Sequence, residues 1–157
     1  MISGRYLSTL TAMALPIAFP AAAALSDSAK LADYVGKYPF QKVHGQRFME
    51  NRAVIVAVRK AVAEPLIAQE VLRGGVSTPI VLVGSAVVSW SCRPHMCGLV
   101  NWAVAVRPVN GKAAVCYHHY NLTGNESRWF VEGRLVANTI GDCGSPSLPR
   151  AVAAAIG

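Results

Sequence analysis

The sequence has few charged residues, and acids are especially scarce. Only 8 of its 157 residues are Asp or Glu, and charged residues make up 15% of the chain, whereas hydrophobic residues make up 53%. This composition supplies enough apolar side chains for a core and differs from that of a disordered chain. Repeats and low-complexity segments are missing beyond the N-terminal region. We therefore expect one folded domain of ordinary size.

Familiar catalytic motifs are also missing. The sequence has no Ser or Cys nucleophile in an elbow motif, no HExxH zinc signature and no Gly-rich phosphate loop. Nothing in it places two acids together as a glycosidase requires. We expect neither an enzyme nor a bound cofactor or metal.

A continuous basic surface is not apparent, although the formal net charge is +7. The basic residues are scattered singly, and Arg59 and Lys60 are the only adjacent pair. Nucleic-acid-binding proteins usually gather such residues on one face and interleave them with aromatics. We therefore expect no nucleic-acid partner, while the basic balance leaves an anionic cell-envelope partner open.

The N-terminal residues have the layout of a secretory signal peptide. Arg5 gives a basic start, residues 7–19 form an apolar run, and residues 21–24 are small. Pro16 and Pro20 interrupt the run, which makes it a poor membrane span and leaves a retained anchor as the alternative. We predict a signal peptide over 1–24, a single domain over 25–157 with no membrane span, and a periplasmic or secreted location.

The four cysteines all lie after this segment, in a region that would fold where disulfides persist. Four cysteines allow three pairings. The spacing favours a bond between Cys92 and Cys97, which leaves Cys116 to pair with Cys143.

The hydrophobic periodicity changes from helical to extended at Gly74 and Gly75. Before these glycines the pattern is weakly helical over 29–35, and apolar residues recur at three- and four-residue intervals over 47–62. A second short helix is expected over 66–72, where the glycines would end it. The N-terminal half is therefore expected to be helical.

Beyond the glycines, β-branched segments predict antiparallel strands joined by tight turns. Gly84 and Ser85 form one hairpin signal, and Asn110 and Gly111 predict a type I′ turn with positive φ at both positions. This order predicts an α+β domain with an antiparallel sheet of about five strands flanked by helices. The expected strands are 79–83, 86–90, 101–109, 113–120 and 128–131, and a terminal helix is expected over 147–156.

The segment SCRPHMC, residues 91–97, falls between two expected strands. Closing so short a ring stabilises a fold by only about 2 kcal/mol, so rigidity is a better reason for the disulfide. Pro94 would add to that rigidity by fixing its φ near −65°. A histidine on a stiff ring can enter another molecule's cleft with little loss of conformational freedom, which makes His95 the candidate binding residue.

Other interpretations of His95 remain open at this point. In the simplest interpretation, His95 is an ordinary surface histidine. A metal site would combine it with the loop cysteines and with His118 and His119, although structural zinc sites usually add a second pair of ligands elsewhere. A redox disulfide is a third alternative, but the spacing is not CxxC.

The loop sequence CRPHMC resembles the CKPHDC signature of the inhibitor of vertebrate lysozyme family, periplasmic bacterial proteins usually called Ivy. YVGKYPF at 34–40, RFMENRAV at 47–54, Gly98 and NWAVAV at 101–106 are also placed as in similar sequences of that family. The resemblance covers most of the chain after the expected signal peptide.

This resemblance implies an often dimeric protein whose disulfide-closed loop enters the active-site cleft of C-type lysozyme and so protects peptidoglycan. The loop histidine, the key group of the family, corresponds to His95. Cys92 and Cys97 would set the shape of the loop, Pro94 its backbone, and Arg93 would add a contact at the rim.

The chain departs from the family in two ways. Met96 stands where the family commonly has an acid. The mature chain would carry 14 − 8 = +6 charges, which would repel a strongly basic lysozyme unless acids gather near the loop. Glu126, Glu132 and Asp142 are candidates for such a patch. The alternative function is a secreted interaction domain of the same fold with another cell-envelope partner.

Overall fold

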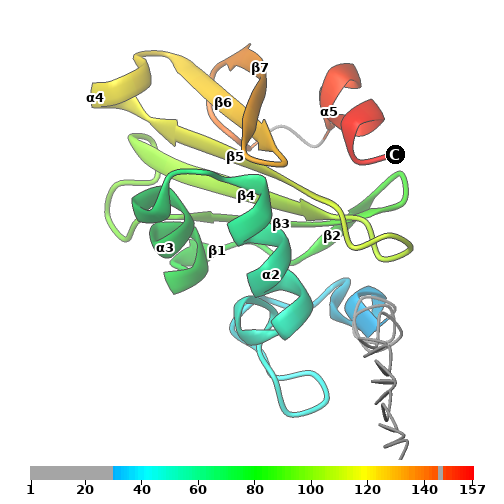
Figure 1. Ribbon diagram of the computed structural model, residues 1–157. Helices are drawn as coiled ribbons and strands as arrows, with labels where there is room; N and C mark the ends of the chain where they lie inside the picture. The colour runs from blue at the N-terminus through cyan, green and yellow to red at the C-terminus, as the bar shows by residue number, and fades with distance from the viewer. Residues whose placement is uncertain (1–29, 145–146) are drawn as a thin grey trace, which may run out of the picture.

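The computed structural model describes residues 30–144 and 147–157, so the predicted signal peptide lies outside the described residues. The helices α2 to α5 and the strands β1 to β7 are labelled in Figure 1. The helices are η1 (Lys30–Tyr34), η2 (Phe48–Glu50), α2 (Arg52–Ala61), α3 (Pro65–Arg73), α4 (Tyr120–Thr123) and α5 (Arg150–Ala155). The strands are β1 (Val76–Ser77), β2 (Val81–Val83), β3 (Ala86–Cys92), β4 (Val100–Val106), β5 (Ala113–His119), β6 (Glu126–Val131) and β7 (Arg134–Ile140).

The predicted α+β class with an antiparallel sheet is confirmed, but the sheet has seven strands, not about five. Its order is β1-β3-β4-β5-β6-β7, and β2 also pairs with β3. The prediction missed β1 and β7. β1 has two residues, too few for a pattern. β7 is an edge strand with no fully buried residue, so it lacks the alternation of a half-buried strand.

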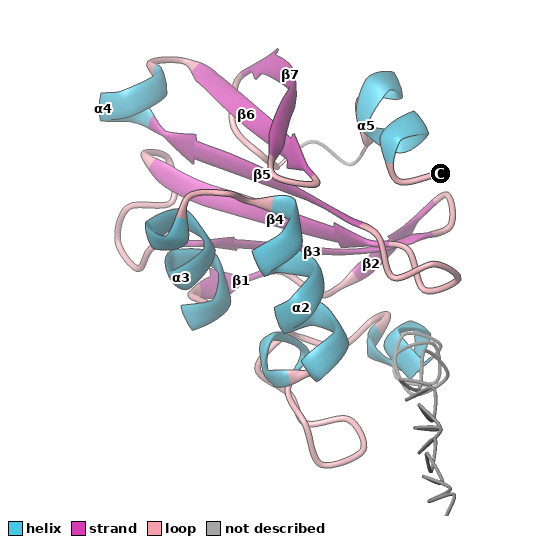
Figure 2. Ribbon diagram, in the orientation of Figure 1, coloured by secondary structure: helices cyan, strands magenta, loops and turns pink. Residues whose placement is uncertain are grey.

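Helices cover both faces of this sheet. Figure 2 shows α2 and α3 on one side and α5 on the other. Phe48, Val58 and Trp102 are part of the core under α2 and α3, whereas Trp129 and Val152 are part of the core under α5. Every residue of the central strand β4 is buried, because it is covered from both sides. In the described part of the chain, no helix has the length and apolar character needed to cross a bilayer.

The helix expected over 47–62 is divided in two. The 3₁₀ turn η2 ends before Asn51, whose side chain accepts a hydrogen bond from the backbone N of Ala53 at 2.9 Å. Asn51 therefore caps the N-terminus of α2, a position for which asparagine is well suited. The apolar period continues through both pieces, which is why it did not reveal the break.

The type I′ turn predicted at Asn110 and Gly111 is wrong. Only Gly111 has a positive φ, of 67°, and the turn is wider, with Arg107 N bonded to Lys112 O at 2.9 Å. The Asn110 amide instead donates to the carbonyl of Ile156 at 3.1 Å and so holds the end of α5. A tertiary contact thus overrides the local preference.

Two other described turns do have two consecutive positive φ values: His44–Gly45, between the bridged residues Val43 and Gln46, and the turn that joins β6 to β7. The central residues of the β6–β7 turn are Glu132, with φ of 50°, and Gly133, with φ of 75°. Several other predicted boundaries move by a few residues. The terminal helix begins at Arg150, after Pro149, and β5 ends at His119 because Tyr120 starts α4.

Candidate functional site: the disulfide-closed loop

The candidate loop joins the neighbouring antiparallel strands β3 and β4. The predicted bonds between Cys92 and Cys97 and between Cys116 and Cys143 are both confirmed. The loop leaves the sheet at the end where β5 runs into α4, and α3 lies at the same end (Figure 1). It therefore projects from a rigid edge with a helix on either flank.

A tight turn forms the tip of the loop. Met96 N donates to Arg93 O at 3.0 Å, so Pro94 and His95 are the central residues of the turn. His95 has a φ of 62° and is exposed. Proline followed by a residue of positive φ is the type II pattern, in which glycine is normally the second central residue. The histidine is thus held at the tip in a conformation that its own side chain disfavours.

Met96 anchors the base of the loop. Its side chain is half-buried against the core under α2 and α3. Its carbonyl accepts hydrogen bonds from Leu99 N and Val100 N, both at 2.8 Å, and Val100 O accepts one from Arg93 N at 3.0 Å. Met96, which stands where the CKPHDC signature has an acid, therefore packs inward.

A buried asparagine links the loop to the second disulfide. Asn101 is fully buried, and its Nδ2 donates to Cys97 O at 2.9 Å. Its Oδ1 accepts from Cys143 N, also at 2.9 Å. One amide therefore ties both cysteine bridges together across the start of β4.

An ion pair connects the other side of the loop to α3. Arg93 donates through Nε to Glu70 Oε1 at 2.9 Å, and its Nη2 also contacts that oxygen. The Tyr117 hydroxyl donates to Glu70 Oε2 at 2.5 Å. We call Glu70, Arg93 and Tyr117 the Glu70 bracket. The rim contact expected of Arg93 stays a prediction, although Nε and Nη2 of its guanidinium already bind Glu70 and hold the loop.

The electrostatics of the bracket favour a carboxylate facing a protonated phenol. Burial raises the pKa of Glu70, but the hydrogen bonds from Tyr117 and Arg93 outweigh it, so the pKa lies below its usual range. Burial, together with the adjacent carboxylate, raises the pKa of Tyr117. The Tyr117 hydroxyl therefore keeps its proton and acts as the donor.

His118 and His119, the histidines of the metal alternative, do not join His95. His118 is buried and its Nδ1 lies 2.9 Å from Glu126 O, whereas His119 is on the opposite face of β5, beside the Tyr117 ring. All four cysteine sulfurs are committed to disulfides, so the thiolates needed by the zinc alternative are not available. Within the described ranges, no three His, Cys, Asp or Glu residues are grouped as a metal site.

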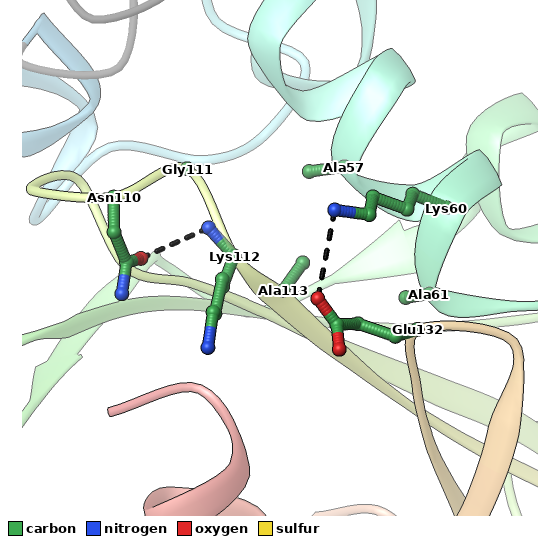
Figure 3. A pocket seen from close by; sticks show the side chains of 8 residues that line it. All are labelled: Ala57, Lys60, Ala61, Asn110, Gly111, Lys112, Ala113 and Glu132. Carbon is green, nitrogen blue, oxygen red and sulfur yellow. Dashed lines mark hydrogen bonds and ion pairs between the residues drawn. The ribbon is translucent and has the colours of Figure 1, made fainter.

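Two of the three acids proposed as a patch near the loop lie at the loop end of the sheet. Glu126 is the first residue of β6, and Asp142 follows the last residue of β7 by two positions. Glu132 lies at the opposite end, where its Oε1 is 3.5 Å from Lys60 Nζ (Figure 3). The small hollow drawn in Figure 3 belongs to that far end and includes none of the loop residues.

Three site residues were not identified from the sequence: Glu70, Asn101 and Tyr117. Their partners lie 23 to 47 residues away along the chain, apart from the contact of Asn101 with Cys97. No local pattern signals such contacts.

Comparisons of the chain with protein-family models, with curated proteins and with solved structures found no match.

Proposed function

We propose that this protein inhibits a C-type lysozyme by inserting the tip of the loop, with His95 foremost, into the active-site cleft. The observation that carries the proposal is an exposed histidine at positive φ on a disulfide-closed turn. Glycine would fit that backbone with less strain, so the fold itself gives no reason for histidine. Contact with another molecule is such a reason. The similarity of CRPHMC to CKPHDC suggests that this molecule is a C-type lysozyme.

The chemistry of the cleft suits an imidazole. Lysozyme hydrolyses glycosidic bonds with a general-acid glutamic acid and an aspartate on the other side of the scissile bond. The two ring nitrogens of His95 can form hydrogen bonds with both carboxyl groups. The hydrogen bond to an ionised carboxylate is charge-assisted and therefore strong. A loop in this position blocks the sugar chain, so inhibition is steric and competitive.

The attachments of the loop support this mode of binding. The Cys92–Cys97 bridge, the Glu70 bracket and Asn101 restrain three different parts of the loop. Ordering a flexible side chain at an interface costs about 0.5–1.5 kcal/mol, and an already ordered loop avoids much of that cost.

A periplasmic or secreted location belongs to the same proposal. The two disulfides are consistent with an oxidising compartment. In the periplasm the protein would protect peptidoglycan from lysozyme that crosses the outer membrane.

The decisive experiment measures lysis of a cell-wall suspension by a C-type lysozyme in the presence of residues 25–157. We expect inhibition by the wild type and at least about 30-fold weaker inhibition by His95→Ala, which is the loss of a hot-spot residue. His44→Ala is the matched control, because His44 is also exposed and also has positive φ, but it pairs with Asp33 outside the loop. Unchanged lysis with the wild type would refute the proposal and favour another cell-envelope partner.

A further inference from the structure

The loop is too small to form the whole interface of a stable complex. It contains six residues from Cys92 to Cys97, of which Pro94 and His95 are the exposed ones. Specific interfaces usually bury about 800 Å² and involve about 20–30 residues on each partner. If the loop enters a cleft, the surface beside it must meet the walls of that cleft.

One flank of the loop carries large exposed apolar side chains. Leu99 is 46% exposed, Tyr120 is 53% exposed and Leu122 is 66% exposed. The backbone N of Tyr120 donates to Leu99 O at 2.8 Å, so α4 directly adjoins the last residues of the loop. We call these three residues the α4 rim. Exposed Tyr and Leu beside a projecting loop match the composition of interface cores better than that of an ordinary surface.

The α4 rim has a fixed backbone. Thr123 Oγ1 lies 2.6 Å from Glu126 O and 3.2 Å from His119 O, which ties the end of α4 to both adjacent strands. Gly124 N donates to Tyr120 O at 2.8 Å and closes the turn. The rim can therefore meet a partner without first being ordered.

The charge around the rim also suits a basic partner. Residues 118–127 contain a single formal charge, the carboxylate of Glu126, in a chain with a net charge of +7. α4 itself has no charged residue. Like charges facing each other across an interface are costly, so a flank without cations is the place where a basic lysozyme can approach.

We infer that the α4 rim is a second contact surface for the same C-type lysozyme, packing on the outer wall of the cleft while His95 occupies its floor. This inference rests on the proposed function. The other flank, α3, presents the polar Glu70 bracket to the loop and serves to hold it.

The experiment measures the binding of residues 25–157 to a C-type lysozyme by surface plasmon resonance, together with thermal unfolding. We expect the double variant Tyr120→Ser, Leu122→Ser to raise Kd at least 10-fold, mainly through faster dissociation, with an unchanged unfolding temperature. Leu135→Ser is the matched control, since Leu135 is 51% exposed at the opposite end of the sheet, and its Kd should equal that of the wild type. Leu66→Ser tests the α3 flank and should also bind as the wild type does.

Three results would overturn the inference. The first is a rim variant with wild-type affinity, and the second is an equal loss in Leu66→Ser. The third is a free protein that sediments as a dimer and becomes monomeric in the rim variant, because the rim would then bind a second copy of the chain. A failure of the proposed function looks different, since the wild type itself would not bind lysozyme and His95→Ala would change nothing.

Discussion

At the scale of single residues, His95 occupies a backbone conformation that glycine adopts more easily. Its φ of 62° lies in the left-handed region, which costs a residue with a Cβ roughly 1–2 kcal/mol. His44 and Glu132 are the other non-glycine residues with positive φ in the described part of the chain. His44 and Glu132 are exposed as well, so the positive φ alone does not distinguish His95; its position at the tip of a disulfide-closed turn does.

The first prediction separates binding from folding at His95. Replacing it with glycine should leave the free energy of unfolding unchanged or raise it by up to about 1 kcal/mol. Glycine relieves the backbone strain of the folded state, and the higher conformational entropy of the unfolded chain offsets only part of this stabilisation. Inhibition of lysozyme should be lost at the same time. Chemical denaturation and the lysis assay measure the two effects. A loss of more than 1 kcal/mol would mean that the imidazole supports the fold.

At the scale of secondary-structure elements, the loop is held by elements that come before and after it in the chain. α3 supplies Glu70, and β5 supplies Tyr117, so the Glu70 bracket joins three segments. The Glu70 side chain is 18% exposed and the Arg93 side chain 41%, so the pair is shielded from solvent on the side of the acid only. The bracket fixes how the loop stands relative to the sheet, whereas the disulfide fixes its internal shape.

The second prediction concerns Glu70→Gln, which should weaken inhibition about 3- to 10-fold by loosening Arg93. Because folding lowers the pKa of Glu70, its carboxylate stabilises the fold above the ordinary value of 4.5, and this contribution is lost as the pH falls through the lower folded pKa. The stability advantage of the wild type over Glu70→Gln should therefore be constant near neutral pH and shrink below pH 4.5. Denaturant titrations at several pH values measure it.

The control for this variant is Glu64→Gln, at the exposed N-cap of the same helix, where the side chain makes no capping hydrogen bond. It should retain wild-type inhibition. If it weakens inhibition as much as Glu70→Gln does, the effect comes from net charge and not from the bracket.

The third prediction compares the two disulfides. The loop-entropy relation gives about 2 kcal/mol for the separation of 5 residues and about 3.5 kcal/mol for the separation of 27. Replacing Cys92 and Cys97 by serine should therefore abolish inhibition with a modest loss of stability. Replacing Cys116 and Cys143 should cost more stability and spare more inhibition per folded molecule. The reverse order in lysis and denaturation assays would contradict this division of roles.

Local patterns in the sequence predicted the elements whose side chains have a clear inside and outside. α2, α3 and the central strands were found because their apolar period is regular, and the loop was found because its residues are consecutive. The edge strand β7 and the capping by Asn51 were missed, since the first has little contrast between its faces and the second does not interrupt the period. The Glu70 bracket was missed because only the folded chain brings its members together.

At the scale of the whole molecule, the net charge is positive and therefore does not attract a basic enzyme. The net charge is +7 for the full sequence and 14 − 8 = +6 without the predicted signal peptide, and Glu132, one of the eight acids, is paired at the far end of the sheet. Long-range electrostatics therefore oppose the encounter, while short-range contacts at the loop end would hold the complex together.

The fourth prediction follows from this balance. The association rate constant with a C-type lysozyme should increase several-fold when the salt concentration rises from about 20 to 300 mM, because the repulsion is screened over a Debye length that falls below about 10 Å. The dissociation rate should change much less. Stopped-flow measurements provide both rates. Association that slows with added salt would show that local acids guide the encounter.

The attachment of α5 has a practical consequence for these measurements. Asn110 holds the carbonyls of Ile156 and Gly157 at the turn after β4, which is the end of the sheet away from the loop (Figure 1). An affinity tag or biotin fused after Gly157 would thus attach the protein to a sensor chip by the end of the sheet opposite the loop. His95 would then face the dissolved analyte. For the same reason, a reporter enzyme or a fluorophore attached to that terminus would not cover the loop that carries His95.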